Sequence, residues 1–194
     1  MKPILFNTAM VQAILEGRKT VTRRAIKPQP AGELRPMGRG SCWPGCFEAS
    51  GEERIYRPPY QPGDVLYVRE TWAEMPYGYV YRADEEQPEG WEVDDCWRPS
   101  IHMPRAAARI FLRVTAVKVA RLRDMVLADV LMEGVEEADA YENTWDSWHQ
   151  TWNSTIKPKV LPVYGWEANP WVWVIGFERI SREEAEKRLR GVSV

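Results

Sequence analysis

A long segment of period-two hydrophobicity near the middle of the chain limits the folds that the chain can adopt. Ile110, Leu112 and Val114 alternate along the sequence, and Val117 and Val119 resume the alternation one residue out of phase. Period two is typical of a β-strand with one buried face. The slip at 115–116 predicts a bulge or bend, as found where a strand curves around a barrel. The sequence therefore predicts one long, bent strand.

Shorter local patterns predict the elements around this strand. Asn7 is a suitable N-cap for a helix that Gly17 ends, and Gly134 ends a second helix over 126–133. Aromatic residues at spacings of four, three and four predict a helix over 139–153 whose stripe packs in the core or, less commonly, stacks on bases. The stripe is Tyr141, Trp145, Trp148 and Trp152. Strands are expected at 65–68, 78–83 and 171–177, and Ser181 opens a C-terminal helix.

These elements do not alternate as parallel βαβ units would. We therefore predict an α+β fold, a small and mostly antiparallel β-barrel decorated by helices. Pro and Gly are concentrated in residues 28–61 and acidic residues in 84–100, and both stretches are predicted to be irregular insertions. Residues 1–180 are expected to form a single domain, with 181–194 as a helical tail.

Composition excludes several classes of protein. Hydrophobic residues make up 44% of the 194 residues and charged residues 28%, so the chain has enough apolar surface to fold. No apolar run reaches the length of a membrane span, and the N-terminus lacks the apolar core of a secretory signal. The 3 Cys are an odd number, which argues against a disulfide framework. We expect a cytoplasmic protein without membrane contacts, and the sequence does not indicate its oligomeric state.

The net charge of −2 hides a segregation of charge along the chain. Residues 1–39 carry eight basic and two acidic side chains, and residues 105–123 carry six basic and no acidic ones. Residues 84–95 and 129–146 each carry seven acidic and no basic side chains. A basic face suited to phosphates is therefore expected, although the whole chain is not a polycation.

Two motifs resemble the ASCH domain family, which belongs to the PUA-like superfamily of small β-barrels. They are GRKTVTRR at 17–24 and PGDVLYVRET at 62–71. Segments 99–105 and 166–174 look like the longer phage and prophage members. The resemblance implies a cleft beside the first motif and binding of RNA or a modified nucleoside or nucleotide. It is weak for any one activity, because a fold does not fix a function.

One branch of the family is similar to amidohydrolases that remove acetyl from 4-N-acetylcytidine. Carried over by motif, its catalytic Lys, Thr and Glu fall on Lys19, Thr22 and Glu133. In that scheme Lys19 is the base that activates the Thr22 hydroxyl, and Glu133 donates or accepts the proton of the leaving amine. The branch is much shorter than this chain. The alternative is that Lys19 and its Arg neighbours form a solvated phosphate-binding patch without catalysis.

Further residues are candidates for substrate or nucleic-acid contacts. Arg24, Arg69 and Glu70 could frame the cleft, or could form a structural Arg–Glu pair that braces the barrel. His102 could contact substrate or be a hydrogen-bonded structural residue. The full set of candidate binding residues is Arg18, Arg23, Arg24, Arg69, Glu70, His102 and Arg105.

A zinc site is a weaker hypothesis. The zinc-binding residue types are Cys42, Cys46, Cys96 and His102. Three residues separate Cys42 from Cys46, and the sequence contains no C-x-x-C motif that would complete a typical zinc site. Free thiols in loops are the alternative, and we expect no cofactor. The sequence thus supports an ASCH-type nucleic-acid- or nucleoside-binding protein that is either an amidohydrolase on a modified base or a non-catalytic RNA-binding module. A metal-dependent ribonuclease is a further alternative.

Overall fold

The computed structural model describes residues 1–38, 41–42, 44–84, 96–136 and 141–190. It has the mixed α+β composition that the sequence predicts, with antiparallel sheets and one parallel strand pair. The largest sheet has the strand order β1-β6-β9-β10-β2, and within the described ranges its strands do not close into a barrel. The arrangement is compatible with a PUA-like fold.

The described strands and helices are bounded as follows. The strands are β1 (Lys2–Leu5), β2 (Val21–Ala25), β3 (Leu34–Pro36), β4 (Phe47–Ala49), β5 (Ile55–Tyr56), β6 (Val65–Arg69), β7 (Trp72–Met75), β8 (Gly78–Tyr81), β9 (Phe111–Arg121) and β10 (Trp171–Ile180). The α-helices are α1 (Thr8–Leu15), α2 (Leu127–Met132), α3 (Tyr141–Ser154), α4 (Leu161–Tyr164) and α5 (Arg182–Leu189). Short 3-10 helices are η1 (Ser100–His102), η2 (Arg105–Ala107), η3 (Leu122–Asp124), η4 (Pro158–Val160) and η5 (Trp166–Ala168).

The chain divides into two compact units, each assembled from separate stretches. Unit 1 comprises Met1–Thr20, Gly63–Val114 and Phe177–Val194, and unit 2 comprises Val21–Pro62 and Thr115–Gly176. The long strands β9 and β10 contribute residues to both units. The boundary in β9 falls at the predicted phase slip, after Val114, although β9 continues as one strand across it.

Unit 1 is organised around β6. The turn that precedes it places Gly63 at φ +90°, a backbone conformation that glycine adopts without strain. The Gly63 amide donates to the Val114 carbonyl (2.8 Å), and the Val114 amide donates to the Asp64 carbonyl (2.9 Å), which starts the antiparallel β6–β9 pairing. On its other side β6 pairs with β1 in parallel. The predicted strand at 65–68 is thus confirmed as an inner strand.

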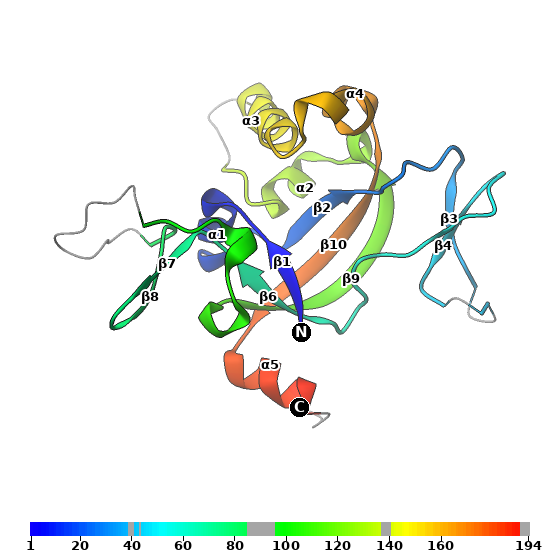
Figure 1. Cartoon of the computed structure of the whole chain (residues 1–194). Coiled ribbons are helices and arrows are strands. Elements are labelled where there is room, and N and C mark those ends of the chain that lie inside the picture. Colours follow the sequence, from blue (N-terminus) through cyan, green and yellow to red (C-terminus); the bar gives the residue numbers. More distant parts are fainter. Residues whose placement is uncertain (39–40, 43, 85–95, 137–140, 191–194) are drawn as a thin grey trace. The chain divides into compact units, whose positions relative to one another are not determined.

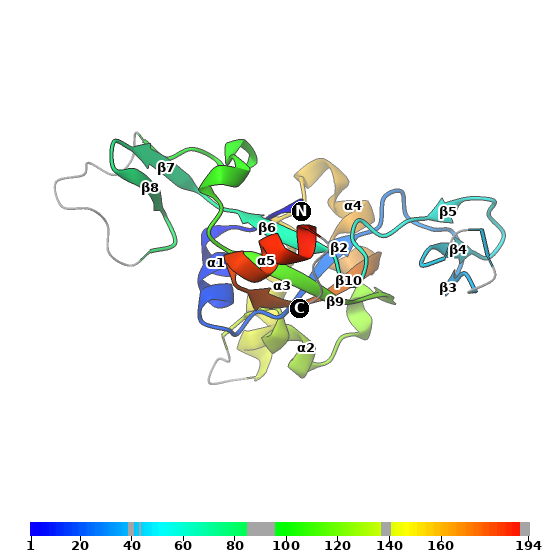
Figure 2. The ribbon, with the colours of Figure 1, turned by 90° about the horizontal axis from the view of Figure 1, so that it is seen from below.

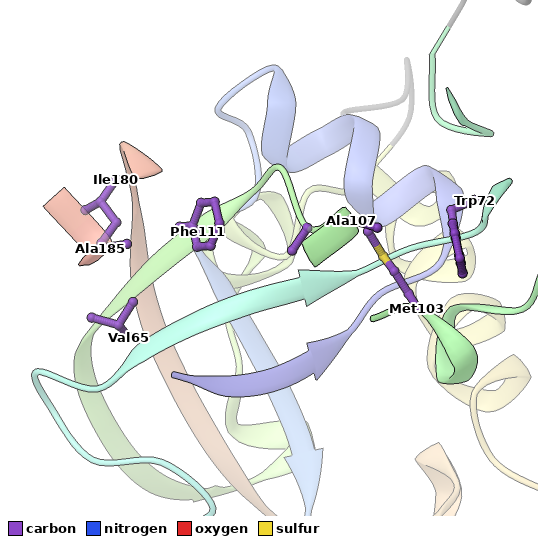
Figure 3. Packing of buried hydrophobic residues seen from close by; sticks show 8 residues of the cluster. Val65, Trp72, Met103, Ala107, Phe111, Ile180 and Ala185 are labelled. Atoms are coloured by element: carbon purple, nitrogen blue, oxygen red, sulfur yellow. The ribbon is translucent and has the colours of Figure 1, made fainter. Parts of the chain in front are cut away.

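The start and the end of α1 and the start of α5 lie where the sequence predicts them. The Asn7 side chain accepts a hydrogen bond from the Met10 amide (2.9 Å) at the start of α1, and Gly17 follows the helix at φ +80°. The Ser181 hydroxyl accepts a hydrogen bond from the Glu184 amide (3.1 Å) at the start of α5. Ala185 of α5 is buried in a cluster with Phe111 and Met103 (Figure 3). The segment predicted as a tail is therefore packed against the core of unit 1.

A two-stranded ribbon of unit 1 includes the predicted strand at 78–83. β8 covers Gly78–Tyr81 and pairs with β7, with Trp72 opposite Tyr81 (Figure 1). Most of the predicted insertion at 84–100 lies outside the described residues, whereas Arg98 forms an isolated bridge with Trp72. No helix in the described ranges combines the length and the apolar character needed to cross a membrane.

Unit 2 is built on the antiparallel β2–β10 pair and the helices that pack on it. Val172 of β10 is buried in a cluster with Val130 of α2 and with Trp148 and Trp152 of α3. The prediction that the aromatic stripe of α3 is core is confirmed for these two Trp residues. The predicted helix over 126–133 is also confirmed, because α2 ends before Gly134, which has φ +87°.

The prediction that residues 28–61 lack regular structure is wrong. They contain the three-stranded antiparallel sheet β3-β4-β5, whose strands lie side by side in Figure 2. Leu34, Ala49 and Tyr56 are buried, and the Phe47 ring of β4 packs edge-on against Trp173 of β10, with centroids 5.3 Å apart. Its strands are two or three residues long, which is too short for an alternating pattern to stand out among the Pro and Gly residues.

Candidate functional site

Arg23 on β2 forms a buried ionic cluster with α2. Its Nη1 lies 3.2 Å from Glu133 Oε1, and its Nη2 lies 3.1 Å from Asp129 Oδ1. The Arg23 and Glu133 side chains are only 4% and 2% exposed. Glu133 is the C-cap of α2, and Asp129 also accepts a hydrogen bond from the Val126 amide at the helix start (3.0 Å). The cluster therefore joins both ends of α2 to β2.

The guanidinium of Arg23 keeps one donor unused. Its Nε is buried and has no hydrogen-bond partner among the described residues. A buried donor of this kind costs free energy unless a ligand or water completes it. The Arg23 side chain therefore combines a structural ion pair with a donor that could serve a bound group.

Arg24 has a different environment from Arg23. Successive side chains of a strand leave opposite faces, so Arg24 and Thr22 share one face of β2 and Arg23 occupies the other. Desolvation lowers the pKa of the half-buried Arg24 guanidinium, and the fields of Tyr60 and Glu133 oppose that shift. Arg24 is thus a cation partly removed from water.

The predicted catalytic residues are all buried. Thr22 is 3% exposed, and Glu133 is 4% exposed within the same unit. Thr22 is the sequence neighbour on β2 of Arg23, which pairs with Glu133. Lys19 belongs to unit 1, is 2% exposed, and places its Nζ 5.6 Å from the centre of the Phe6 ring.

The predicted Arg–Glu brace exists in unit 1, but Arg69 is not the cation. Arg69 Nε donates instead to the Met103 carbonyl (2.8 Å). The buried Glu70 carboxylate accepts two hydrogen bonds from Arg109, from Nε and Nη2, each of 3.0 Å. Asp84 binds the same guanidinium (2.6 Å), which lies 3.9 Å from the centre of the Tyr81 ring. Desolvation raises the pKa of Glu70, and Arg109 opposes that shift.

The other predicted contact residues of unit 1 lie at the surface. Arg18 Nε donates to the Glu16 side chain (2.6 Å). His102 and Arg105 are exposed on η1 and η2.

The structure gives no support to the zinc hypothesis. Cys46 is buried, whereas Cys42 and Cys96 are exposed, and all three are free thiols. In the part of the chain that the structure describes, no group of three or more His, Cys, Asp or Glu side chains is placed to hold a metal ion.

A second candidate surface, the Asn169 corner, consists of Arg121, Arg123, Trp166, Asn169 and Trp171. The guanidinium of Arg121 lies 4.5 Å from the centre of the Trp171 ring, and that of Arg123 lies 5.9 Å from the centre of the Trp166 ring. Asn169 has φ +45° and accepts two hydrogen bonds. Its backbone carbonyl accepts one from Arg121 Nη1 (3.2 Å), and its side-chain Oδ1 accepts one from the backbone amide of Arg123 (2.8 Å). The corner thus holds two cations over two indole rings.

His149 of α3 borders the Asn169 corner and did not stand out in the sequence. Its ring stacks on Trp166 with centroids 4.0 Å apart. Its Nε2 is buried without a hydrogen-bond partner among the described residues. Desolvation lowers the pKa of His149. The charges of Asp146 and Glu167 act to raise this pKa, whereas the charge of Arg123 lowers it further. The spacing of four from Trp145 was the one local signal that places His149 on the aromatic face of α3.

Comparisons with known proteins leave the family of this chain open. No family model matches it, and no curated protein matches it. Among solved structures it is similar to the crystal structure of protein EF3133 from Enterococcus faecalis V583, described with the family model DUF984. That likeness has 12% sequence identity and a TM-score of 0.44, and covers 93% of this chain and 82% of the other. A likeness this distant carries no conclusion about function.

Arg23→Met should destabilise the protein by about 3–5 kcal/mol, because it removes the guanidinium that pairs with the buried Glu133 carboxylate at 3.2 Å. The double variant Arg23→Met/Glu133→Gln should be less destabilised than the single one, since it also removes the charge of that buried carboxylate. Urea unfolding measures both. Arg35→Met on β3 is the control, since its side chain is 70% exposed and its loss should change the free energy of unfolding by less than about 0.5 kcal/mol. Equal effects of Arg23→Met and Arg35→Met would contradict the structural role of Arg23.

His149 should titrate below the ordinary histidine pKa of 6.5 in the folded protein. The unfolded chain then binds the proton more readily, so the free energy of unfolding should fall as the pH drops below about 6.5 and level off below the folded pKa. NMR titration of the His149 ring gives the pKa directly, and His149→Gln should lack this part of the pH dependence. A midpoint at or above that of the urea-unfolded chain would show the prediction to be wrong.

Proposed function

We propose that this chain is an ASCH-type protein that binds nucleic acid or a nucleoside. The observation that carries the proposal is the pairing of cations with aromatic rings in unit 2. Arg121 lies over Trp171, Arg123 over Trp166, and Lys27 over Tyr164 with Nζ 5.0 Å from the ring centre. Basic side chains attract phosphates, and the half-buried rings of Trp171 and Tyr164 offer surfaces on which bases stack, so this combination suits a single-stranded nucleic acid.

The arginines of the basic segment 105–123 differ in how far they are available to such a ligand. Arg109 is held by Glu70 and Asp84, and Arg113 by Glu178. The ion pair of Arg123 with Glu167 is long, at 3.7 Å, and joins side chains that are 50% and 88% exposed. Exposed pairs of this kind stabilise a protein by well under about 1 kcal/mol. Arg121 and Arg123 are therefore the arginines of β9 and η3 most able to exchange their present contacts for phosphate.

RNA binding should weaken with salt and depend on the Asn169 corner. Arg121→Ala/Arg123→Ala should lower the affinity for a single-stranded RNA. It should also reduce the slope of log K against log salt by about 1.4, at roughly 0.7 per lost phosphate contact. Fluorescence anisotropy over a salt series measures both quantities.

A matched control separates this effect from net charge. Arg35→Ala/Arg98→Ala removes the same two charges from side chains that are 70% and 54% exposed. It should leave the affinity and the salt slope close to those of the wild type. Equal losses in the two double variants, or binding that ignores salt, would contradict the assignment of this surface.

An amidohydrolase acting on an acylated nucleobase is a second candidate function. The observation that favours it is the burial of Lys19, Thr22 and Glu133 at 2%, 3% and 4% exposure, because polar groups shielded from water are typical of reaction sites. Thr22 would attack the amide carbon and Lys19 would accept the hydroxyl proton. The Glu133 carboxylate would relay that proton to the leaving amine, and water would then hydrolyse the acyl ester on Thr22. No observation in the described residues favours the metal-dependent ribonuclease.

Hydrolysis of N-acylated cytidines and adenosines, followed by liquid chromatography, tests this candidate. The wild type should release the unacylated nucleoside and the carboxylic acid, and Lys19→Ala and Thr22→Ala should each abolish release. Lys159→Ala and Thr155→Ala are controls of the same residue types at exposed positions, and both should retain activity. Thermal unfolding of each variant shows whether a loss reflects unfolding. No turnover by the wild type, or turnover that survives both site substitutions, would eliminate this mechanism.

A further inference from the structure

Unit 1 contains a pocket that the proposed function does not use. Its volume is about 420 Å³, within the range of roughly 300–1,000 Å³ typical of small-molecule sites. Three arginines, Arg105, Arg182 and Arg190, line it together with one carboxylate, Glu186. Phe111 and Leu189 supply apolar surface.

One face of α5 forms a wall of this pocket. Positions 182, 186, 189 and 190 follow the helical spacings of four, seven and eight, so their side chains leave the helix on the same side. Ala185, three residues after Arg182 and four before Leu189, lies at the edge of this face and is buried in one cluster with Phe111 and Ile180, which fixes α5 beside the pocket (Figure 3). Arg105 comes from η2, elsewhere in unit 1. Separate stretches of the chain therefore supply the cations.

The pocket cations differ from the other arginine of α5. Arg188 is held by Glu184, with Nη2 3.0 Å from Oε1. In contrast, no carboxylate of the described residues forms an ion pair with Arg105, Arg182 or Arg190. Arg182 is positioned by its hydrogen bond to the Ala108 carbonyl and by the Phe111 ring, whose centre is 5.1 Å from the guanidinium carbon. The pocket thus holds an excess of two positive charges that its own side chains do not neutralise.

We infer that this pocket binds a phosphate monoester whose ester group carries an aromatic or apolar part. A phosphate monoester carries about −1.5 to −2 charges at pH 7, which matches the excess charge of the lining. Guanidinium groups donate in a planar fork that fits phosphate oxygens. Phe111 and Leu189 would contact the ester group. A free mononucleotide and the 5′-phosphate end of a nucleic-acid strand share this chemistry, and the pocket lies in the unit that lacks the Asn169 corner.

Calorimetric titration with cytidine 5′-monophosphate tests the inference. The wild type should bind it, and cytidine without phosphate should bind at least about tenfold more weakly, since it offers the arginines no charged oxygens for hydrogen bonds. Arg105→Gln/Arg190→Gln should weaken binding of the monophosphate by at least about tenfold. Both side chains are exposed, so the variant is expected to fold. Glu186→Gln should strengthen binding, because it removes the one carboxylate of the lining.

Two controls keep the result distinct from the proposed function. Arg179→Gln/Lys187→Gln removes the same charge from exposed positions of unit 1 outside the pocket and should bind as the wild type does. Arg121→Ala/Arg123→Ala removes the Asn169 corner and should also leave monophosphate binding unchanged. Binding that fails in this last variant but survives in Arg105→Gln/Arg190→Gln would place the ligand at the corner and overturn the inference.

RNA oligonucleotides distinguish the two sources of phosphate. If the strand end is the ligand, a 5′-phosphorylated strand should bind more tightly than its 5′-hydroxyl counterpart, and Arg105→Gln/Arg190→Gln should abolish the difference. If the free nucleotide is the ligand, the two strands should bind alike while the monophosphate still requires both arginines. Absence of any phosphate-dependent binding that these arginines control would overturn the inference.

Discussion

The buried ion pair between Arg23 and Glu133 limits the arrangement of unit 2 more than any other polar contact described. A guanidinium and a carboxylate removed from water each need the other, so β2 and the end of α2 are tied together. The tie also specifies register, because Arg23 lies opposite Val174 of β10. A shift of β2 by one residue would move the Arg23 guanidinium to the other face of the strand and break its ion pairs with Glu133 and Asp129.

Much of the fold follows from signals that are local in the sequence. Asn7 and Gly17 bound α1, Ser181 opens α5, and the alternating residues of 110–119 form most of β9. These signals work because capping groups and period-two patterns act over a few residues. β1 escaped prediction since Pro3 interrupts its pattern, and an outer strand of the sheet tolerates this proline.

The candidate sites were harder to predict, because their partners are distant in the sequence. The pairing of Glu70 with Arg109 joins residues 39 positions apart, and that of Arg23 with Glu133 joins residues 110 apart. The sequence identified Glu70 and Arg23 as notable but could not supply their partners. His149 had no motif, and its position matters only because η5 brings Trp166 against its ring. Composition likewise showed a basic segment without showing which cations are neutralised.

The binding capacity of the basic segment 105–123 depends on which of its cations are neutralised by carboxylates. Its six cations suggest one continuous phosphate-binding stripe, yet the structure divides the five arginines by partner, and Lys118 is exposed on β9. Arg109 and Arg113 are held by carboxylates, whereas Arg121 and Arg123 lie over indole rings and Arg105 lines a pocket with two arginines from α5. A carboxylate neutralises a guanidinium, whereas an aromatic ring orients it and leaves its charge in place. Arg123 also has a long, exposed ion pair with Glu167. The arginines of this segment that are most available to ligands therefore lie at two places in different units, and each place must be tested by its own substitutions.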